Sequence, residues 1–487
     1  MTYFEKTIKS FLATMFCQYL ECFIIDKDKH FVRNRKMGFI DHIKFIIWNN
    51  GRNNDIEASE FFKVFLKKKY ETISSQAIGK QRAFIHPDLF INLYKRFIDF
   101  LYKKHKHFSE FKGYIVGAYD GSIIDLPNVT LTRREFGIKP DTIFKKHRVR
   151  ARVSGIMDVN SKFMLTTKIV EKTVKETELA MQHLDDLKKR FNIEKFITIY
   201  DRGYKSIELM IYTEKINSKF LIRLPKNAFT KQIGRIKGND KIIEINLTNS
   251  VIKEFEREST KKFAREMGRY YARVVVVRLE NGTKEVLITN LDAEEFTTDD
   301  LKELYGQRWS IETGYKKLKS QIQIEQFSGH RRIIIEQDFY ASIFVYNLAT
   351  AIQWDGEKHM SIQKRNPDKE YIYKSNFASI VGIMYVYMED ILSGDSRTVN
   401  QVITFLIEQA KRLYHQKNIK ELKIIKLKKI IRDLILQVLW GDDWENKKSA
   451  RGAKDPSNDH PRTPKTHSLI LIIGIIFFSL LIGIYGL

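Results

Sequence analysis

Apolar and polar residues recur at three- and four-residue intervals through the first part of the chain. Because this spacing places apolar side chains on one face of a helix, we predict a helical N-terminal region over residues 1–108. The stretches that show it are "TIKSFLATMFCQYLECFII", "HIKFIIWNN", "EASEFFKVFLKKKYE" and "DLFINLYKRFIDFLYKKHK".

From Gly113 the pattern changes to the runs and alternations typical of strands. "YIVGAYDGSIIDLP" predicts a strand, a turn and a second short extended piece, and "RVRARVSGIMDVNSKFMLTTKIV" predicts a hairpin that turns at "DVNSK". An amphipathic helix, "ETELAMQHLDDLKKRF", and a buried strand, "KFITIY", follow. We therefore predict a mixed α/β core whose first part is residues 109–219.

A β-rich segment interrupts this core over residues 220–297. It contains "KFLIRLP", "KIIEINL" and "RVVVVRLENGTKEVLITNL", the last a hairpin with Asn281-Gly282 in its turn. The helical pattern resumes at Thr298, and residues 298–355 are assigned to the second part of the core. The rest divides into a helical C-terminal region, a polar linker and an apolar tail, which are residues 356–445, 446–467 and 468–487.

The tail carries no charged residue from Ser468 to Leu487, and a stretch of about 20 apolar residues can span a bilayer. It follows the polar segment "KDPSNDHPRTPKTH". Two interpretations stay open, a C-terminal membrane anchor and a reading frame extended past its natural end.

Charge adds a prediction about partners. The chain has 84 Lys and Arg against 59 Asp and Glu, a net charge of +25. Such an excess favours a polyanionic partner, either nucleic acid or an anionic membrane, although a Lys-rich genome would also produce it. A short helix with Lys80, Gln81 and Arg82 is typical of a helix-turn-helix, or of any basic surface helix.

Two further features give weaker predictions. Residues 411–432 read as a basic amphipathic helix that could bind nucleic acid or membrane, or form a solvated face. The two cysteines, Cys17 and Cys22, lack the spacing of a zinc or redox motif, so we expect core thiols of a cytosolic protein.

Three carboxylates from distant parts of the chain are candidates for chemistry. Asp120 and Asp201 each follow an apolar strand segment, and each alone is typical of a turn or cap residue. On neighbouring strands, and joined by a helical Glu312, they would supply the oxygen ligands that hard divalent cations need. Two Mg²⁺ ions about 4 Å apart can activate a water or a 3′ hydroxyl for phosphodiester chemistry.

Glu312 belongs to a stripe with Tyr305, Arg308 and Lys319 in "YGQRWSIETGYKKLK". At about 100° per residue these four side chains fall within about 60° of each other on one helix, beside its apolar face. Snorkelling explains the basic residues on such a border but not the carboxylate among them. The stripe is about 21 Å long, which suits an extended phosphate polymer better than a compact metabolite.

The spacing Tyr-x2-Arg-x3-Glu-x6-Lys resembles the Y-R-E-K signature of the DDE transposases of the insertion-sequence-four family. "YDGS…LP" and "DRGY" resemble the segments around that family's first and second catalytic aspartates, which places these at Asp120 and Asp201. The resemblance covers about residues 75–410 and includes a β-rich insertion before the catalytic glutamate. The basic segment and the apolar tail beyond it depart from the family pattern.

This resemblance implies an α/β fold with a ribonuclease H-like mixed sheet flanked by helices, a β-rich insertion, and all-helical N- and C-terminal regions. It implies that the two aspartates and Glu312 hold two Mg²⁺ or Mn²⁺ ions. Tyr305, Arg308 and Lys319 would grip the terminal DNA phosphates. Further candidates are Arg202 and Trp309 as DNA contacts, the latter alternatively a core residue, and Asp125 as a substitute first ligand.

The implied activity is binding of the element's terminal inverted repeats, hydrolysis of the end phosphodiester, and joining of the 3′ hydroxyl to target DNA. The expected partners are double-stranded DNA and a second copy of the chain, and the expected location is the cytoplasm, on DNA. Rival interpretations are an inactive or domesticated DNA-binding derivative and a membrane-tethered protein.

Overall fold

The structure is a computed structural model in which the chain divides into two compact units. One comprises Met1–Lys369 and Tyr373–Gln416, and the other Glu370–Ile372 and Lys417–Leu487. All contacts discussed below lie within the first unit. The structure describes residues 2–49, 51, 53–105, 108–137, 148–225, 228–230, 238–278, 283–363 and 371–418.

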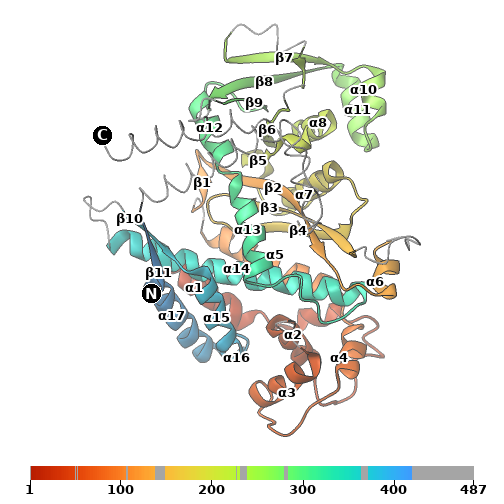
Figure 1. Ribbon diagram of the computed structural model, residues 1–487, viewed down its shortest axis with the longest axis vertical. Helices are drawn as coiled ribbons and strands as arrows, with labels where there is room; N and C mark the ends of the chain where they lie inside the picture. The colour runs from red at the N-terminus through yellow and green to blue at the C-terminus, as the bar shows by residue number, and fades with distance from the viewer. Residues whose placement is uncertain are drawn as a thin grey trace, which may run out of the picture. The chain divides into compact units, whose positions relative to one another are not determined.

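A nine-stranded sheet runs through the described residues, with helices on both of its faces (Figure 1). Its strand order is β4-β3-β2-β5-β6-β9-β8-β7, and β1 pairs with β2. The strands are β1 (Glu110–Phe111), β2 (Tyr114–Asp125), β3 (Arg150–Asp158), β4 (Met164–Glu171), β5 (Phe196–Tyr200), β6 (Lys219–Arg223), β7 (Asp240–Asn246), β8 (Arg269–Arg278) and β9 (Lys284–Thr289).

The first five long strands have the order of the predicted ribonuclease H-like fold. β4, β3 and β2 are antiparallel neighbours, and β5 and β6 follow parallel to β2 on its other side. The sequence placed β6 in the β-rich insertion, whereas its pairing adds it to the core sheet. β9, β8 and β7 extend the same sheet as an antiparallel ladder. The predicted turn Asn281-Gly282 lies outside the described residues.

Helices α7 and α13 lie on opposite faces of this sheet. Consecutive residues of a strand face opposite sides, and two neighbours in β3 show which helix covers which face. The Ser154 hydroxyl lies 2.9 Å from His183 of α7, whereas Gly155 faces the hydroxyl of Tyr315 on α13. With both faces covered, β5 is buried over its whole length, as expected of a parallel strand.

The remaining helices form the predicted N- and C-terminal helical regions and the connections of the core. Helices α2 and α5 pack on α14, and α1 packs on α17 (Figure 1). The helices are α1 (Tyr3–Thr14), η1 (Gln18–Phe23), α2 (Phe39–Trp48), α3 (Asn54–Val64), α4 (Ser75–Arg82), α5 (Asp88–Lys104), α6 (Thr130–Glu135), α7 (Glu176–Arg190), η2 (Ile193–Lys195), η3 (Arg202–Tyr204), α8 (Ile207–Lys215), α10 (Asn249–Lys253), α11 (Glu258–Met267), α12 (Thr298–Gly306), α13 (Trp309–Ser320), α14 (Arg332–Gln363), α15 (Phe377–Val386), α16 (Met388–Ile391) and α17 (Ser396–Arg412).

Helix α4 is the short basic helix that the sequence compared with a DNA-reading helix. Ser74 caps its first turn, and Lys80 is exposed. Arg82, however, is 2% exposed and donates to Gln337 and to Asp338 of α14. Arg82 therefore attaches α4 to the long helix of the core, and its burial argues against a contact with DNA.

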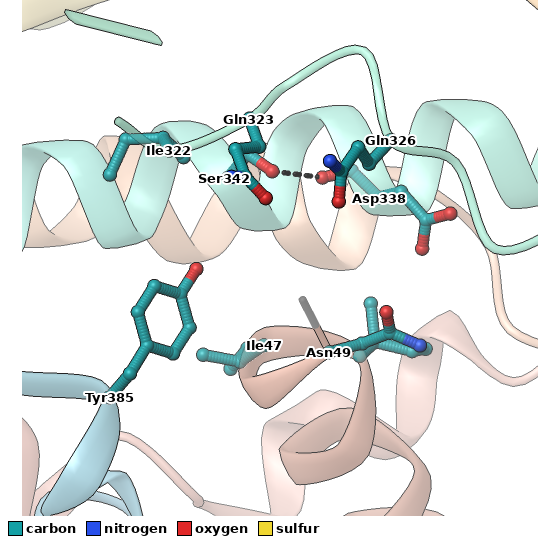
Figure 2. Close-up of a pocket in the computed structure, with 9 residues that line it drawn as sticks. Ile47, Asn49, Ile322, Gln323, Gln326, Asp338, Ser342 and Tyr385 are labelled. Carbon is teal, nitrogen blue, oxygen red and sulfur yellow. Dashed lines mark hydrogen bonds between the residues drawn. The ribbon is translucent and has the colours of Figure 1, made fainter. Parts of the chain in front are cut away.

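The loop after α13 also reaches the N-terminal helices. Figure 2 shows a pocket between the end of α2, α14 and α15, lined by Asn49, Asp338, Tyr385 and residues of that loop. Its volume is about 10 Å³, which is room for about one water molecule. The N–H of Gln326 donates to the carbonyl of Gln323 at 2.8 Å and shapes the loop there. This pocket is a packing detail, too small for a ligand.

Three expectations need correction or fall outside the described chain. Cys22 is exposed, so it is not the core thiol that we predicted, while Cys17 is half-buried. The basic segment predicted as a helix over residues 411–432 is described only as far as residue 418, where α17 ends at Arg412 and a strand, β11 (Tyr414–Asn418), follows. The strand β10 is Tyr371–Ser375. Among the described residues, no helix is long and apolar enough to cross a bilayer. Residues 419–487, which include the apolar tail, lie outside them.

Candidate active site

Asp120 lies within β2, at the point where the strand loses one of its neighbours. On one side it pairs with Gly155 of β3, but on the other the ladder with β5 ends at Ala118 and Ile199. The sequence predicted a turn here, because Asp-Gly favours turns. The continuous pairing with β3 keeps the chain extended instead, so Asp120 stands at an open strand edge.

Asp201 directly follows β5 and begins the short helix η3. Its Oδ1 accepts from the N–H of Arg202 at 2.7 Å and from the Tyr305 hydroxyl at 3.1 Å, and it lies 2.9 Å from the Arg223 guanidinium. Since β2 and β5 are adjacent, the strands that lead to Asp201 and Asp120 are neighbours, as predicted.

The helix predicted to run from Tyr305 to Lys319 is broken. α12 ends at Gly306 and α13 begins after Arg308. The N–H of Arg308 donates to the carbonyl of Tyr305 at 3.1 Å, and such a tight bond to the third preceding residue marks a change of helix direction. The expected continuous stripe is therefore wrong, because Tyr305 and Glu312 lie on different helices.

A glycine allows α13 to lie close against the sheet. A Cβ added at Gly314 would stand 2.0 Å from the end of the Met157 side chain in β3, so a larger residue there would require that side chain to move. The next residue, Tyr315, donates from its hydroxyl to the backbone carbonyl of Asp120 at 3.1 Å. Close packing and this bond together fix α13 over the middle of β2.

A cavity of about 370 Å³ lies between β2 and α13. Asp120 and Glu312 both line it, as does Lys319, whose ammonium donates to the carbonyl of Ile123 at 2.6 Å. Arg308 is 4% exposed and donates to Glu312 at 2.8 Å. The structure thus brings two of the three predicted carboxylates to one cavity, and Arg308 and Lys319 contact protein atoms there.

Each of the three carboxylates makes its hydrogen bonds through one oxygen. Oδ1 of Asp120 accepts from the N–H of Gly121 at 2.8 Å and from the Tyr204 hydroxyl at 3.3 Å. Oδ1 of Asp201 and Oε1 of Glu312 accept all the bonds given above. In the part of the chain that the structure describes, the second oxygen of each accepts no hydrogen bond. These second oxygens are therefore available to an added cation.

The charges of the site affect its two aspartates in opposite ways. Burial, together with the charges of Glu312 and Asp201, raises the pKa of Asp120 to about 6. Burial also acts to raise the pKa of Asp201, but the Arg223 and Arg308 guanidiniums hold it below its usual value. Asp120 is therefore the carboxylate whose charge is least compensated by the protein.

Whether this site suits a divalent cation depends on the atoms that it offers as ligands. Within the described ranges, no group of three or more His, Cys, Asp or Glu side chains is close enough together to hold a metal ion. The donor type fits, because hard divalent cations prefer carboxylate oxygens. The charge also fits, because burial and the neighbouring carboxylates Glu312 and Asp201 raise the pKa of Asp120, and a cation would favour its charged form. Ligation by all three would require the carboxylates of Asp120, Asp201 and Glu312 to move closer together.

We expect D120N to stabilise the metal-free protein. The pKa of Asp120 is higher in the folded than in the unfolded protein, so ionisation of this carboxyl group disfavours folding. The wild type should therefore lose stability relative to D120N as the pH rises from about 4 to about 6. The gain in the free energy of unfolding should be near zero at pH 4 and about 1–3 kcal/mol above pH 6, since one pKa unit corresponds to about 1.4 kcal/mol. Urea unfolding in EDTA at several pH values measures it. A gain that does not change with pH would contradict this prediction.

The other predicted residues lie around this centre. Arg202 is exposed beside Asp201, and Trp309 is 51% exposed, so its alternative role as a core residue is wrong. Asp125 ends β2 and pairs with Arg148 at 3.1 Å and with Arg150 at 2.9 Å. Those pairs give Asp125 a role in holding the β2–β3 ladder.

Sequence reasoning missed two residues that contact the carboxylates, Arg223 and Tyr204. Arg223 ends β6, and parallel neighbours end at the same edge of a sheet, so assigning β6 to the core would have placed it near Asp201. Tyr204 ends the "DRGY" motif, but nothing in the sequence showed that its hydroxyl reaches Asp120.

The chain is similar to known proteins in sequence and in structure. Residues 112–348, which contain all three carboxylates, match the family model described as "Transposase DDE domain". Over 177 residues the chain is 23% identical to "Transposase InsG for insertion sequence element IS4" of Escherichia coli (strain K12), a match that covers 36% of this chain and 37% of that protein. The chain therefore spans little more than a third of the length of this curated relative in that match.

A solved structure is also similar, the cryo-EM structure of the piggyBac transposase synaptic complex with hairpin DNA. The similarity covers 84% of this chain and 85% of that chain, with a TM-score of 0.41 and 9% sequence identity. The Y-R-E-K residues, the family match over residues 112–348 and the curated relative therefore agree in one similarity, which is to the DDE transposases of the insertion-sequence-four family.

Proposed function

We propose that this chain cuts the ends of a mobile DNA element at its terminal inverted repeats and joins the freed 3′ hydroxyls to target DNA. The observation that carries the proposal is the cavity between β2 and α13. Asp120 and Glu312 line that cavity, and each has a carboxylate oxygen without a protein hydrogen bond. The family match over residues 112–348 supports the same reaction class.

The proposed cofactor is a pair of Mg²⁺ or Mn²⁺ ions, held by Asp120, Asp201 and Glu312. When bound, such ions activate the attacking oxygen and stabilise the leaving one. Arg308 and Arg223 have the complementary task of orienting Glu312 and Asp201, since each guanidinium contacts one oxygen of its partner.

Contacts to DNA are proposed for the basic groups at this site. Lys319 lines the cavity and its ammonium has three donors, so it can contact a phosphate besides the carbonyl of Ile123. Among the described residues the buried Nε of Arg308 has no hydrogen-bond partner, so this guanidinium keeps a donor for a strand phosphate. Arg202 is exposed beside Asp201. Tyr305 orients Asp201 through its hydroxyl and would contact the strand after that bond is released.

The N-terminal region, residues 1–108, is proposed to bind the inverted repeats, and the C-terminal region, residues 356–445, to support a homodimer. Two ends must be cut in one event, so two copies of the site would act together on DNA. The net charge of +25 favours this partner over an uncharged one.

The proposal is tested with end-labelled duplex DNA carrying the element's terminal inverted repeats, incubated with the full chain. We expect a nick at the element end with Mg²⁺ and none with EDTA, since phosphodiester hydrolysis depends on the ions. A chain that shifts this DNA on a gel but never cuts it would be a DNA-binding derivative. A chain that neither binds nor cuts would contradict the proposed function.

A further inference from the structure

The hydroxyl of Tyr204 closes the open edge of β2 beside Asp120. The parallel ladder from β5 ends at Ala118, so the backbone beyond it has no strand partner on that side. The N–H of Gly121 donates to the Tyr204 hydroxyl at 3.1 Å, and the same hydroxyl donates to Oδ1 of Asp120 at 3.3 Å. Tyr204 thus takes the place of the missing strand at the position that carries the carboxylate.

The turn that holds Tyr204 begins with the second carboxylate of the site. Asp201 precedes η3, and the N–H of Tyr204 donates to its carbonyl at 3.0 Å. The Asp201 side chain also binds the N–H of Arg202, which fixes the start of the same turn. One short turn therefore presents Asp201 at one end and contacts Asp120 at the other, so it sets the spacing of the two carboxylates.

The ring of Tyr204 is held in one orientation by other aromatic residues. Its centroid lies 4.9 Å from that of Tyr119, edge to face, and 6.2 Å from that of Tyr200. The residue is 5% exposed. A ring so packed cannot swing away, and its hydroxyl stays between Asp120 and Glu176, whose carboxylate lies beside Gly121.

We propose that Tyr204 is a positioning residue for Asp120: it occupies Oδ1 and leaves Oδ2 as the oxygen for a divalent cation. This inference rests on the proposed function, because it assigns a role in forming the same metal site. Groups that hydrogen-bond a metal-ligating carboxylate typically affect metal affinity by about 10–100-fold. Tyr204 would act through Asp120 alone, without touching the cation or the DNA.

The test measures Mn²⁺ binding to the full chain by isothermal titration calorimetry, with MnCl₂ as the probe. Y204F keeps the ring and its packing and removes only the hydroxyl, so we expect the apparent Kd for Mn²⁺ to rise about tenfold. Y200F is the matched control, because the buried Tyr200 hydroxyl of the same aromatic cluster makes no hydrogen bond with any residue that the structure describes. Its Kd should equal that of the wild type. An unchanged Kd in Y204F, or an equal rise in Y200F, overturns the positioning role.

A second arm separates positioning from a general loss of structure. In a D120N background the carboxylate is already neutral, so adding Y204F should not weaken Mn²⁺ binding further. A further loss there would mean that Tyr204 acts on the fold as a whole, and would overturn the proposal. If the wild-type chain binds no Mn²⁺, the proposed metal site is itself wrong. This outcome differs from a failure of the Tyr204 proposal because it is seen without any substitution.

Discussion

Replacement of Glu312 by glutamine is expected to lower end cleavage by about 1,000-fold and to leave binding of end DNA unchanged. Glutamine removes the negative charge of one proposed ligand, and ions in such sites supply several kcal/mol of transition-state stabilisation. A loss of about 4 kcal/mol corresponds to a factor of about 1,000 in rate. The glutamine carbonyl can still accept from Arg308, which pairs with Glu312 at 2.8 Å, so the start of α13 should keep its conformation.

The measurement compares single-turnover nicking of labelled end duplex at saturating protein with gel-shift affinity for the same DNA. E303Q is the matched control, because Glu303 is exposed on α12, outside the cavity between β2 and α13. We expect E303Q to cut at the wild-type rate. If E312Q cut as fast as E303Q, Glu312 would not be a ligand. If it lost DNA affinity in parallel with rate, the substitution would have disturbed the binding surface.

The sequence predicted the central sheet well, because its signals are local. "KFITIY" is a continuous apolar run, and a run of that length is typical of a strand buried on both faces, which β5 is. The hairpin that turns at "DVNSK" likewise appears as β3 and β4. In both, hydrophobic pattern and turn chemistry agree, so a single stretch of chain carries enough information.

The sequence failed where a distant partner decides the conformation. Asp120-Gly121 is a residue pair typical of turns, yet the pairing of β2 with β3 keeps these residues extended. The Tyr305-to-Lys319 segment has helical periodicity throughout, yet it divides into two helices at Arg308. Helical periodicity identifies which residues face the sheet. It does not detect a break in the helix when the residues on both sides of the break still face the sheet.

The same limit applies to roles inside the candidate site. Tyr305 and Arg308 were predicted to grip DNA, and in the structure they donate to Asp201 and Glu312. Basic and phenolic groups suit phosphates and carboxylates equally well, so residue type alone cannot distinguish the two partners. Only the assembled fold shows that these side chains orient the carboxylates in the absence of DNA, and that any grip on a phosphate must use their remaining donors.

Replacement of Arg82 by methionine is expected to destabilise the protein by about 3–5 kcal/mol. Breaking a buried ion pair by removing one partner has a cost of this size, because the other charge is left uncompensated. The Arg82 guanidinium lies 2.5 Å from Asp338 and donates to Ser328 and Gln337, and the side chain is 2% exposed. Methionine fills part of the space but satisfies none of these acceptors.

The free energy of unfolding from urea titration, followed by tryptophan fluorescence, measures this cost. K80M is the matched control on the same helix, and because Lys80 is exposed its effect should stay within about 0.5 kcal/mol. If the penalty arises from the unpaired carboxylate, D338N should cost less in the R82M background than in the wild type. Additive losses would instead assign the cost to packing. A stable R82M with weakened DNA binding would return Arg82 to the recognition role that its burial argues against.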